Sequence, residues 1–347
     1  MFKWSGKIMK RISGVVLSLS ILTGLSYSVA PLTPTVDAAT FAKGADVGWL
    51  SEMESYNWAF YNDAGVKQDA LQILKDHGMN SIRLRVWVNP AKNFSNKADV
   101  IKQAVRAKQM GFRIMIDFHY SDVWADPANQ TKPKDWANKD FNGLMKAVYD
   151  HTYDVLTALK AQGVTPEWVQ VGNETNNGML WEEGRASANM KNFAWLINSG
   201  YDATKAVNSS TKVIVHLSNG YDNSLYRWMF DGLKANGAKY DVIGMSLYPE
   251  KNNWQTLNQQ TLTNMNDMVA RYGKEVMVCE VGMDASDPTT SKAFLTDILN
   301  KTRSVSGGKG LGVFYWEPES YGTWYAYTKG AFDSKGKVTI ALDAFLN

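Results

Sequence analysis

Cysteine is almost absent from this sequence. The 347 residues include a single cysteine, Cys279, so the chain cannot form a disulfide within itself. The sequence also lacks Cys/His clusters with the spacing of metal ligands, and no glycine-rich phosphate-binding loop follows its first predicted strand. These absences argue against a disulfide-stabilised fold, a metal site and a nucleotide-binding sheet. We therefore expect neither a metal nor an organic cofactor.

The N-terminal segment has the order of regions that is typical of a secretory signal. Basic residues precede an apolar stretch from 12 to 30, and proline and small residues follow it. A membrane anchor is the alternative, but Ser, Thr and Gly interrupt this stretch and no charged flank follows it. Because Pro31 makes cleavage after Ala30 unfavourable, we expect a signal peptide over residues 1–39, secretion to the extracellular space, and no attachment to a membrane.

Charge of one sign does not dominate the sequence. It contains 37 Lys and Arg residues and 34 Asp and Glu residues, and four of these bases but only one of the acids lie within residues 1–39. The expected mature chain, 40–347, therefore has equal numbers of basic and acidic residues. Because it has no runs of Lys or Arg, the sequence indicates no positively charged surface that would bind nucleic acid or acidic lipid. We expect an uncharged or small partner and infer no obligate protein partner.

Short apolar runs alternate with helical patterns along the expected mature chain. Runs without internal polar alternation are typical of parallel strands that are buried on both faces. The predicted strands span 41–47, 82–88, 113–118, 168–171, 213–217, 242–247, 276–278 and 312–315. The predicted helices span 67–76, 97–110, 144–161, 190–207, 225–235, 262–272, 292–304 and 338–345. This alternation predicts an α/β fold, a single (β/α)8 TIM barrel, rather than an open doubly wound sheet.

Carboxylates close two of the predicted strands. Glu174 follows Asn173 after strand 168–171, and Glu280 follows strand 276–278. In such a barrel the active site lies at the carboxyl ends of the strands, where a carboxylate loses part of its water. One such Glu could form a structural ion pair, but two at matching depths indicate a shared role. Glycoside hydrolysis requires two carboxylates, one to protonate the leaving oxygen and one to attack or stabilise the sugar carbon.

Four segments resemble glycoside hydrolase family 53, and the likeness covers nearly the whole expected mature chain. The segments that start at Asn80, Ile116, Gly172 and Phe314 read NSIRLRVWVNP, IDFHYSDVWADP, GNE and FYWEP. Members of this family are arabinogalactan endo-β-1,4-galactanases of the clan of retaining barrels with catalytic Glu on strands 4 and 7. The resemblance therefore implies hydrolysis of β-1,4-galactan, as in the side chains of pectin, by double displacement.

The resemblance also implies roles for individual residues. Glu174 would be the general acid/base and Glu280 the nucleophile, while Asn173 would hydrogen-bond the 2-hydroxyl of the sugar. The guanidinium groups of Arg83 and Arg85 point to the same side of their strand, and we expect one of them to keep Glu280 ionised. Arg85 is the expected partner because it lies nearer the carboxyl end of the strand, and Arg83 is then a structural ion pair.

Further polar and aromatic residues at strand ends are expected to bind substrate. Tyr248 is the expected hydrogen-bond donor to Glu280, and Trp316 the expected floor for the cleaved sugar, since sugar rings stack on aromatic faces. A metal role for His119 is disfavoured because no metal-ligand spacing accompanies it. The predicted substrate-binding residues are Arg85, Trp87, Asp117, His119, Trp124, Asn173, His216, Tyr248 and Trp316.

The sequence departs from the family pattern after Glu280. Many relatives carry there a longer loop, which binds calcium in some bacterial members and contains a disulfide in fungal members, and neither device is present in this sequence. Cys279 is expected to alternate away from Glu280 into the barrel wall as a small buried hydrophobe. Two alternatives remain: a related hydrolase of mannan, glucan or xylan, and a carbohydrate-binding barrel without activity, which the presence of both Glu residues disfavours.

Overall fold

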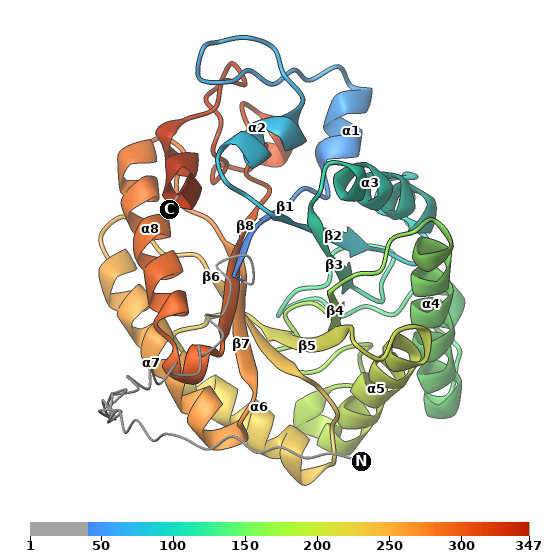
Figure 1. The fold of residues 1–347 in the computed structure, drawn as a ribbon. Helices are drawn as coiled ribbons and strands as arrows, with labels where there is room; N and C mark the ends of the chain where they lie inside the picture. The colour runs from blue at the N-terminus through green and yellow to red at the C-terminus, as the bar shows by residue number, and fades with distance from the viewer. Residues whose placement is uncertain (1–40, 347) are drawn as a thin grey trace, which may run out of the picture. The chain divides into compact units, whose positions relative to one another are not determined.

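The computed structural model describes residues 41–346, which form a closed barrel of eight parallel strands (Figure 1). Each strand is hydrogen-bonded to the next one in sequence, and the last strand pairs with the first. The strands are β1 Ala42–Asp46, β2 Ser81–Val86, β3 Arg113–Phe118, β4 Trp168–Val171, β5 Lys212–Leu217, β6 Val242–Leu247, β7 Glu275–Val281 and β8 Gly310–Trp316. The predicted TIM barrel is confirmed, whereas the predicted signal peptide lies outside the described residues.

Helices lie outside the strands (Figure 1). They are α1 Leu50–Ser55, α2 Ala70–Asp76, α3 Lys97–Gln109, α4 Phe141–Ala161, α5 Ala186–Val207, α6 Asn223–Ala235, α7 Trp254–Tyr272 and α8 Pro288–Arg303, with the short 3-10 helices η2 Lys134–Trp136, η3 Ser306–Gly308, η4 Trp324–Ala326 and η5 Ile340–Leu346. Helix α1 was not predicted, α7 begins at Trp254 rather than Leu262, and the last predicted helix is of the 3-10 type. None of the helices within 41–346 combines the length and apolarity needed to cross a membrane.

Several helices begin with a side chain that caps their first turn. Each of these side chains accepts a hydrogen bond from a backbone N–H that would otherwise have no partner within the helix. The capping residues are Asp69, Asn96, Asp140, Asp222 and Asp287. They fix where the helices start after the loops that follow the strands, and these loops surround the carboxyl ends of the strands.

Apolar side chains fill two separate regions of the barrel. The larger region packs the outer faces of the strands against the helices and includes Ile82, Leu84 and Val86 of β2. The smaller region consists of strand residues only, mostly toward the amino ends of the strands: Ala42, Met115, Trp168, Ile214, Val242, Met277, Cys279 and Phe314. Because side chains alternate along a strand, the inward positions of β2 are occupied by Arg83 and Arg85. The interior thus changes from apolar to polar toward the carboxyl ends.

A bulge in β7 determines where Glu280 points. Met245 of β6 pairs with Val278, but the next residue, Ser246, pairs with Glu280, so Cys279 is an extra residue in β7. As a result both Cys279 and Glu280 face the barrel interior. The prediction that Cys279 is buried is confirmed, but the prediction that it points outward is wrong because strict alternation fails at the bulge.

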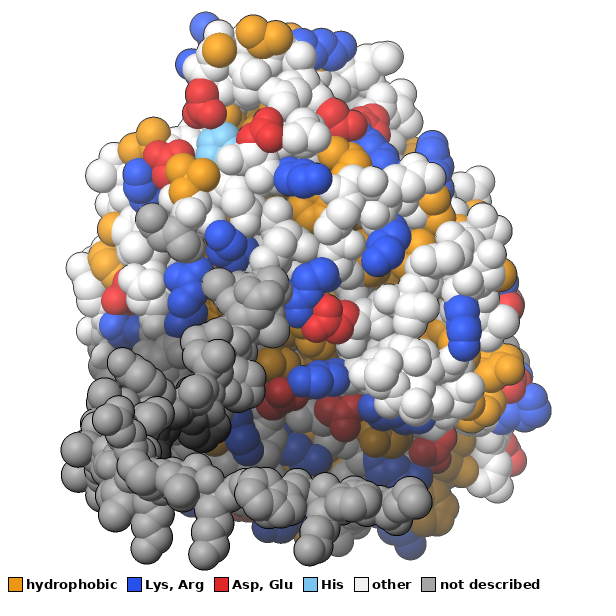
Figure 2. Space-filling view, viewed as in Figure 1, with side chains coloured by type: hydrophobic (Ala, Val, Ile, Leu, Met, Phe, Trp, Pro, Cys, Tyr) orange, Lys and Arg blue, Asp and Glu red, His pale blue; other side chains and the backbone are white. Residues whose placement is uncertain are grey.

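The described surface carries charges of both signs. Figure 2 shows Lys and Arg side chains interspersed with Asp and Glu side chains on the face that it presents. Many of these charges form ion pairs across neighbouring elements, such as Arg106 with Glu54 and Lys212 with Glu275. Exposed pairs of this kind contribute little stability, commonly below about 1 kcal/mol. This face offers no extended patch of one sign.

Candidate active site

A cavity of about 250 Å³ lies at the carboxyl ends of the strands. Seven of the predicted site residues line it, together with Ala125 and Asp126: they are His119, Trp124, Asn173, Glu174, Tyr248, Glu280 and Trp316. The other four predicted residues, Arg85, Trp87, Asp117 and His216, do not line the cavity. The structure therefore brings both predicted catalytic carboxyl groups to one cavity and separates the predicted binding residues into a lining and a supporting set.

An arginine and a tyrosine hold Glu280. Nη1 of Arg83 lies 2.8 Å from Oε1 of Glu280, and the hydroxyl of Tyr248 donates to Oε2 at 2.8 Å. Only 5% of Glu280 is exposed, so these contacts act where water screens little. The hydrogen bond from Tyr248 is confirmed. The expected contact between Arg85 and Glu280 is wrong, because Arg83 occupies that place.

The length of an arginine side chain explains this correction. The guanidinium group lies several bonds beyond the Cα of its residue. An arginine can therefore contact residues that lie nearer the carboxyl ends of the strands than its own Cα does. Arg83 is in register with Asp46 of β1, and its side chain extends from there to Glu280. Arg85 starts two residues nearer the rim, and its guanidinium pairs with Glu317 after the end of β8.

Arg83 lies at the centre of a buried polar network. Its Nη1 lies 2.5 Å from Asp46 and its Nη2 lies 2.9 Å from Asp117, and Nη2 also donates to Oε1 of Gln170 at 3.1 Å. Burial lowers the pKa of Arg83, but the surrounding carboxylates raise it well above the ordinary value, so the guanidinium stays charged. Sequence reasoning missed Gln170, a polar residue within the apolar strand β4, and Asp46, which ends β1; both side chains contact Arg83 inside the barrel.

Two neighbours fix the side chain of Asn173. Nη2 of Arg83 donates to its Oδ1 at 2.9 Å, and its Nδ2 donates to the backbone oxygen of Ala125 at 2.8 Å. An amide group has two N–H donors, so one hydrogen of Nδ2 is not used by Ala125. Asn173 lines the cavity with its orientation already set, and can donate to a bound molecule.

His216 supports the backbone of Glu174 from behind the cavity. Glu174 has a φ of 43°, a left-handed conformation that costs free energy for a residue other than glycine. Its N–H donates to Nδ1 of His216 at 3.3 Å, and the side-chain amide of Gln170 approaches the same nitrogen at 2.9 Å. Nδ1 also lies 3.0 Å from Oδ1 of Asn173, and Nε2 lies 2.8 Å from Oγ of Ser246. Burial lowers the pKa of His216 well below its ordinary value, so the ring is neutral.

The two cavity carboxyl groups have different electrostatic environments. Burial, and then the charge of Glu280, raises the pKa of Glu174 to about 8. Burial also raises the pKa of Glu280, but Arg83 and the hydrogen bond from Tyr248 oppose that rise. Asp46 and Asp117 add to the rise in the pKa of Glu280, whereas Arg83 favours its charged form, and the charge of Glu280 in turn favours the protonated form of Glu174.

Trp87 and Asp117 position His119 at the cavity. Nε1 of Trp87 donates to Nδ1 of His119 at 3.2 Å, and the backbone N–H of Ala125 donates to the same nitrogen at 3.2 Å. Nε2 of His119 therefore carries the hydrogen and donates to Oδ2 of Asp117 at 3.0 Å. Although burial raises the pKa of Asp117, Arg83 holds it below the usual value. Residues of the supporting set thus hold His119 as well as the backbone of Glu174 in place.

Aromatic rings form one wall of the cavity. The ring centroids of Trp124 and Trp316, which both line it, are 5.9 Å apart. Trp49 packs against both, with its centroid 4.9 Å from that of Trp316 and 5.9 Å from that of Trp124. The guanidinium carbon of Arg85 lies 4.5 Å from the Trp124 centroid, a distance typical of a cation–π contact. Arg85 thus supports the aromatic wall.

Two buried carboxyl groups behind this wall were missed by sequence reasoning. Oε2 of Glu317 accepts a hydrogen bond from the backbone N–H of Trp49 at 3.0 Å, and Oε1 pairs with Arg85. Burial raises the pKa of Glu317 to about 7. Burial, and then the charge of Glu317, raises the pKa of Glu319 well above its ordinary value. The pattern Trp-Glu-Pro-Glu at the end of a strand is the signal that could have indicated them.

Metal ligands do not gather in this part of the molecule. Among residues 41–346, no group of three or more His, Cys, Asp or Glu side chains is arranged to hold a metal ion. Of the acidic residues that line the cavity, Glu280 pairs with Arg83, and Asp126 accepts hydrogen bonds from Asn129. The chemistry of this cavity is therefore that of carboxyl groups, an arginine, an amide and aromatic rings.

Comparisons with known proteins agree with this geometry. The family model described as Glycosyl hydrolase family 53 matches residues 42–345. An arabinogalactan endo-beta-1,4-galactanase of Cellvibrio japonicus is 36% identical over 85% of each chain, and a probable arabinogalactan endo-beta-1,4-galactanase A of Aspergillus terreus is 35% identical over 88% of this chain and 91% of its own. The solved GH53 catalytic domain of Ignisphaera aggregans is 30% identical, with a TM-score of 0.81 over 88% of this chain and 95% of that one. This chain is a glycoside hydrolase that belongs to family 53.

Proposed function

We propose that this protein is a secreted endo-β-1,4-galactanase that hydrolyses galactan chains, such as those in the side chains of pectin, with retention of configuration. Family membership and the names of relatives such as the Cellvibrio japonicus enzyme support the substrate class. The signal-like segment 1–39 supports secretion. The observation that carries the mechanism is the contrast between Glu280, held by Arg83, and Glu174, whose pKa is about 8.

In the first step Glu280 attacks the anomeric carbon of the sugar. The bond from that carbon to the glycosidic oxygen breaks as the bond to a Glu280 oxygen forms, and the proton of Glu174 moves to the departing oxygen. Arg83 and Tyr248 keep Glu280 ionised and aim one oxygen each, so the nucleophile needs little reorganisation. The product of this step is a galactosyl ester of Glu280 and a free leaving chain.

In the second step Glu174, now a carboxylate, accepts a proton from water. The water oxygen attacks the anomeric carbon from the face that the leaving group vacated, and the bond to Glu280 breaks. Two inversions at one carbon give a β-configured product. While Glu280 is esterified its negative charge is absent, so the pKa of Glu174 falls, which suits its change from acid to base.

Asn173 and the aromatic wall orient the sugar in this mechanism. The unused N–H of Asn173 donates to the sugar 2-hydroxyl, a contact that strengthens as charge develops in the transition state. Trp316 stacks on the apolar face of the same ring. His119 lines the cavity with both ring nitrogens already hydrogen-bonded to the protein, so it contributes ring surface to the sugar site rather than a hydrogen bond.

Substrate specificity tests the proposed function directly. The purified protein, without residues 1–39, is incubated with β-1,4-galactan, β-1,4-mannan, cellulose and β-1,4-xylan, and new reducing ends are counted. We expect galactan alone to be cleaved at a substantial rate, with an early fall in viscosity because an endo-acting enzyme cuts within chains. Cleavage of another glycan in preference to galactan would contradict the proposal, as would release of galactose alone in the first minutes.

A further inference from the structure

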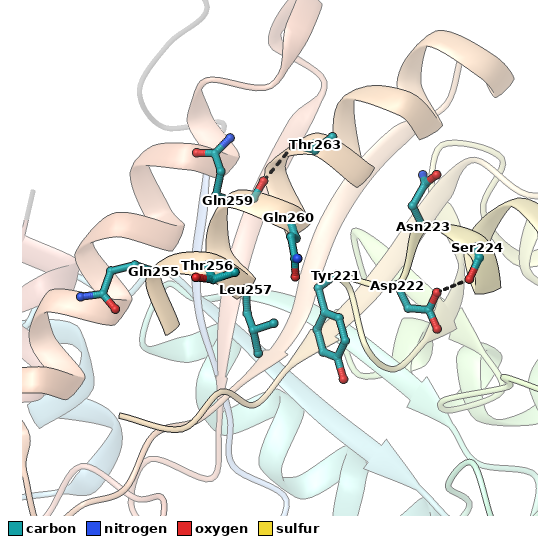
Figure 3. A pocket seen from close by; sticks show the side chains of 10 residues that line it. All are labelled: Tyr221, Asp222, Asn223, Ser224, Gln255, Thr256, Leu257, Gln259, Gln260 and Thr263. Carbon is teal, nitrogen blue, oxygen red and sulfur yellow. Dashed lines mark hydrogen bonds between the residues drawn. The ribbon is translucent and has the colours of Figure 1, made fainter. Parts of the chain in front are cut away.

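We propose that the substrate groove continues beyond the catalytic cavity, over Tyr221, into the crevice between α6 and α7, and that this outer groove binds the uncharged leaving-group end of a long galactan chain. The inference rests on the proposed function and adds a binding site to it. The outer groove is a cavity of about 940 Å³ lined by residues 221–224, where α6 begins, and by Gln255, Thr256, Leu257, Gln259, Gln260 and Thr263 of α7 (Figure 3).

Shared lining residues join the outer groove to the catalytic cavity. An intermediate cavity of about 410 Å³ lies between the two. It shares Glu174 and Tyr248 with the catalytic cavity, and Tyr221 and Leu257 with the outer groove. The volumes of the intermediate cavity and of the outer groove are both in the range of ligand sites, roughly 300–1,000 Å³. A chain that leaves the catalytic cavity on this side therefore has a continuous path to Tyr221.

The order of residues along this path identifies which end of the substrate it receives. The intermediate cavity is lined by Glu174 but not by Glu280. Glu174, as the proposed acid, faces the oxygen of the leaving group, whereas Glu280 faces the sugar that forms the covalent intermediate. The path to the outer groove thus begins on the leaving-group side. That side carries the reducing end of the substrate chain.

The lining of the outer groove suits an uncharged polyhydroxylated chain. Among its lining residues Asp222 alone is charged, and its carboxylate is already used to cap α6. Figure 3 shows Tyr221, Leu257 and Gln260 pointing into the same space, whereas Gln255 points away from it. A tyrosine ring can stack on the C–H face of a sugar, and an amide can pair with its hydroxyl groups. The groove offers no cationic group for an acidic ligand.

The loop that carries Tyr221 is held by its neighbours rather than free at the surface. The N–H of Gly220 donates to the backbone oxygen of Ser246 at 2.8 Å, and the side-chain amide of Asn264 donates to the Gly220 oxygen at 2.8 Å. These bonds tie the loop to β6 and α7, so Tyr221 is presented in one place although 36% of it is exposed. A preordered ring loses less conformational entropy when a sugar stacks on it.

The start of α7 has the composition that such a groove needs. Sequence periodicity predicts the helix only from Leu262, because residues 254–261 are mostly polar and contain just two apolar residues, Trp254 and Leu257. The structure extends the helix back to Trp254, and Gln260 of these added turns faces the groove.

Chain-length dependence tests the inference. We compare kcat/KM for β-1,4-galactan, for galacto-oligosaccharides of increasing length labelled at the reducing end, and for a short aryl β-galactobioside, whose leaving group ends before the groove. Tyr221→Ala and Gln260→Ala should lower kcat/KM on the long substrates about three- to tenfold, the effect of losing one stacking or polar contact. The loss of kcat/KM should grow with the length of the substrate. The products that carry the reducing-end label should be shorter for the variants than for the unmodified protein.

Tyr153→Ala is the matched control, because Tyr153 is 42% exposed on α4 and lies outside all three cavities. It should behave as the unmodified protein on every substrate. Equal rates for both groove variants and the unmodified protein on long chains would overturn the inference, and so would an equal loss in Tyr153→Ala. Failure of the proposed function looks different: the unmodified protein would then not cleave galactan of any length, and the inference would fall with it.

Discussion

Arg83 and Glu280 are joined inside the barrel, with Nη1 of the arginine 2.8 Å from Oε1 of the glutamate. The same guanidinium contacts Asp46 and Asp117, so one buried positive charge serves three carboxylates. Removing such a charge would leave buried anions without compensation, which commonly costs about 3–5 kcal/mol. The ion pair therefore connects the stability of the barrel to the ionisation of the proposed nucleophile.

Exchange of Arg83 for lysine separates this role from that of Arg85. Arg83→Lys keeps the charge but loses the forked contacts, so the pKa of Glu280 should rise. The acidic limb of the pH profile of kcat/KM should then move to higher pH. Arg85→Lys is the control and should leave that limb in place, since Arg85 pairs with Glu317. An equal shift of the limb in both variants would contradict the assignment.

Substitution of the two glutamates should have unequal effects on substrates with good leaving groups. Glu280→Gln should reduce turnover to background on every substrate, because no covalent ester can form. Glu174→Ala should lose about 10²- to 10⁴-fold on galactan but keep the first chemical step on a dinitrophenyl glycoside, whose leaving group needs no proton. Burst kinetics on that glycoside measure this step. Equal losses in both variants would show that the roles are misassigned.

The pKa of Glu174 predicts how activity responds to high pH. Because the proton on Glu174 is needed in the first step, kcat/KM on galactan should fall as the pH rises through about 8. With a dinitrophenyl glycoside the Glu174→Ala variant should lack this basic limb. A profile of kcat/KM against pH, measured for both proteins, tests this. A basic limb that persists in the variant would assign the titration to another group.

Tyr248→Phe should weaken catalysis with little loss of stability. The hydroxyl donates to Oε2 of Glu280 at 2.8 Å, and its removal takes away one of the two groups that aim the nucleophile. We expect kcat to fall roughly 10- to 100-fold, since a hydrogen bond to a charged group contributes about 1.5–3 kcal/mol. The melting temperature should stay within a few degrees. Unchanged kcat would refute the positioning role of Tyr248.

Local sequence patterns were sufficient for the barrel and for the two glutamates. The strands were predicted because parallel strands buried on both faces read as continuous apolar runs, and Glu174 because it ends such a run. Glu280 was found for the same reason, yet its direction depends on a bulge that pairs Ser246 with it and makes Cys279 an extra residue. A bulge is set by pairing between strands, which one strand's sequence does not record.

The residues that support the catalytic groups were harder to predict, because their contacts depend on how far a long side chain extends and not only on its position along the strand. Arg85 was expected at Glu280 from its place near the strand end, but the side chain of Arg83, which starts two residues deeper in the barrel, reaches Glu280 instead, and Arg85 pairs with Glu317. Gln170 interrupts the apolar strand β4 and Asp46 ends β1, and both could have been noticed. The early start of α7 contains only two apolar residues among polar ones, too few for periodicity to indicate it or the groove beside it.

The anomeric configuration of the first product tests the central claim most directly. If Glu280 forms a covalent intermediate and Glu174 activates water on the vacated face, the newly formed reducing end must be β, and the two carboxyl groups should stand about 5–5.5 Å apart. Proton NMR of an early β-1,4-galactan digest measures this configuration before mutarotation equilibrates the signal. The account predicts that the β-anomer appears first. An initial α-anomer would contradict the double-displacement mechanism and the roles assigned to Glu174 and Glu280.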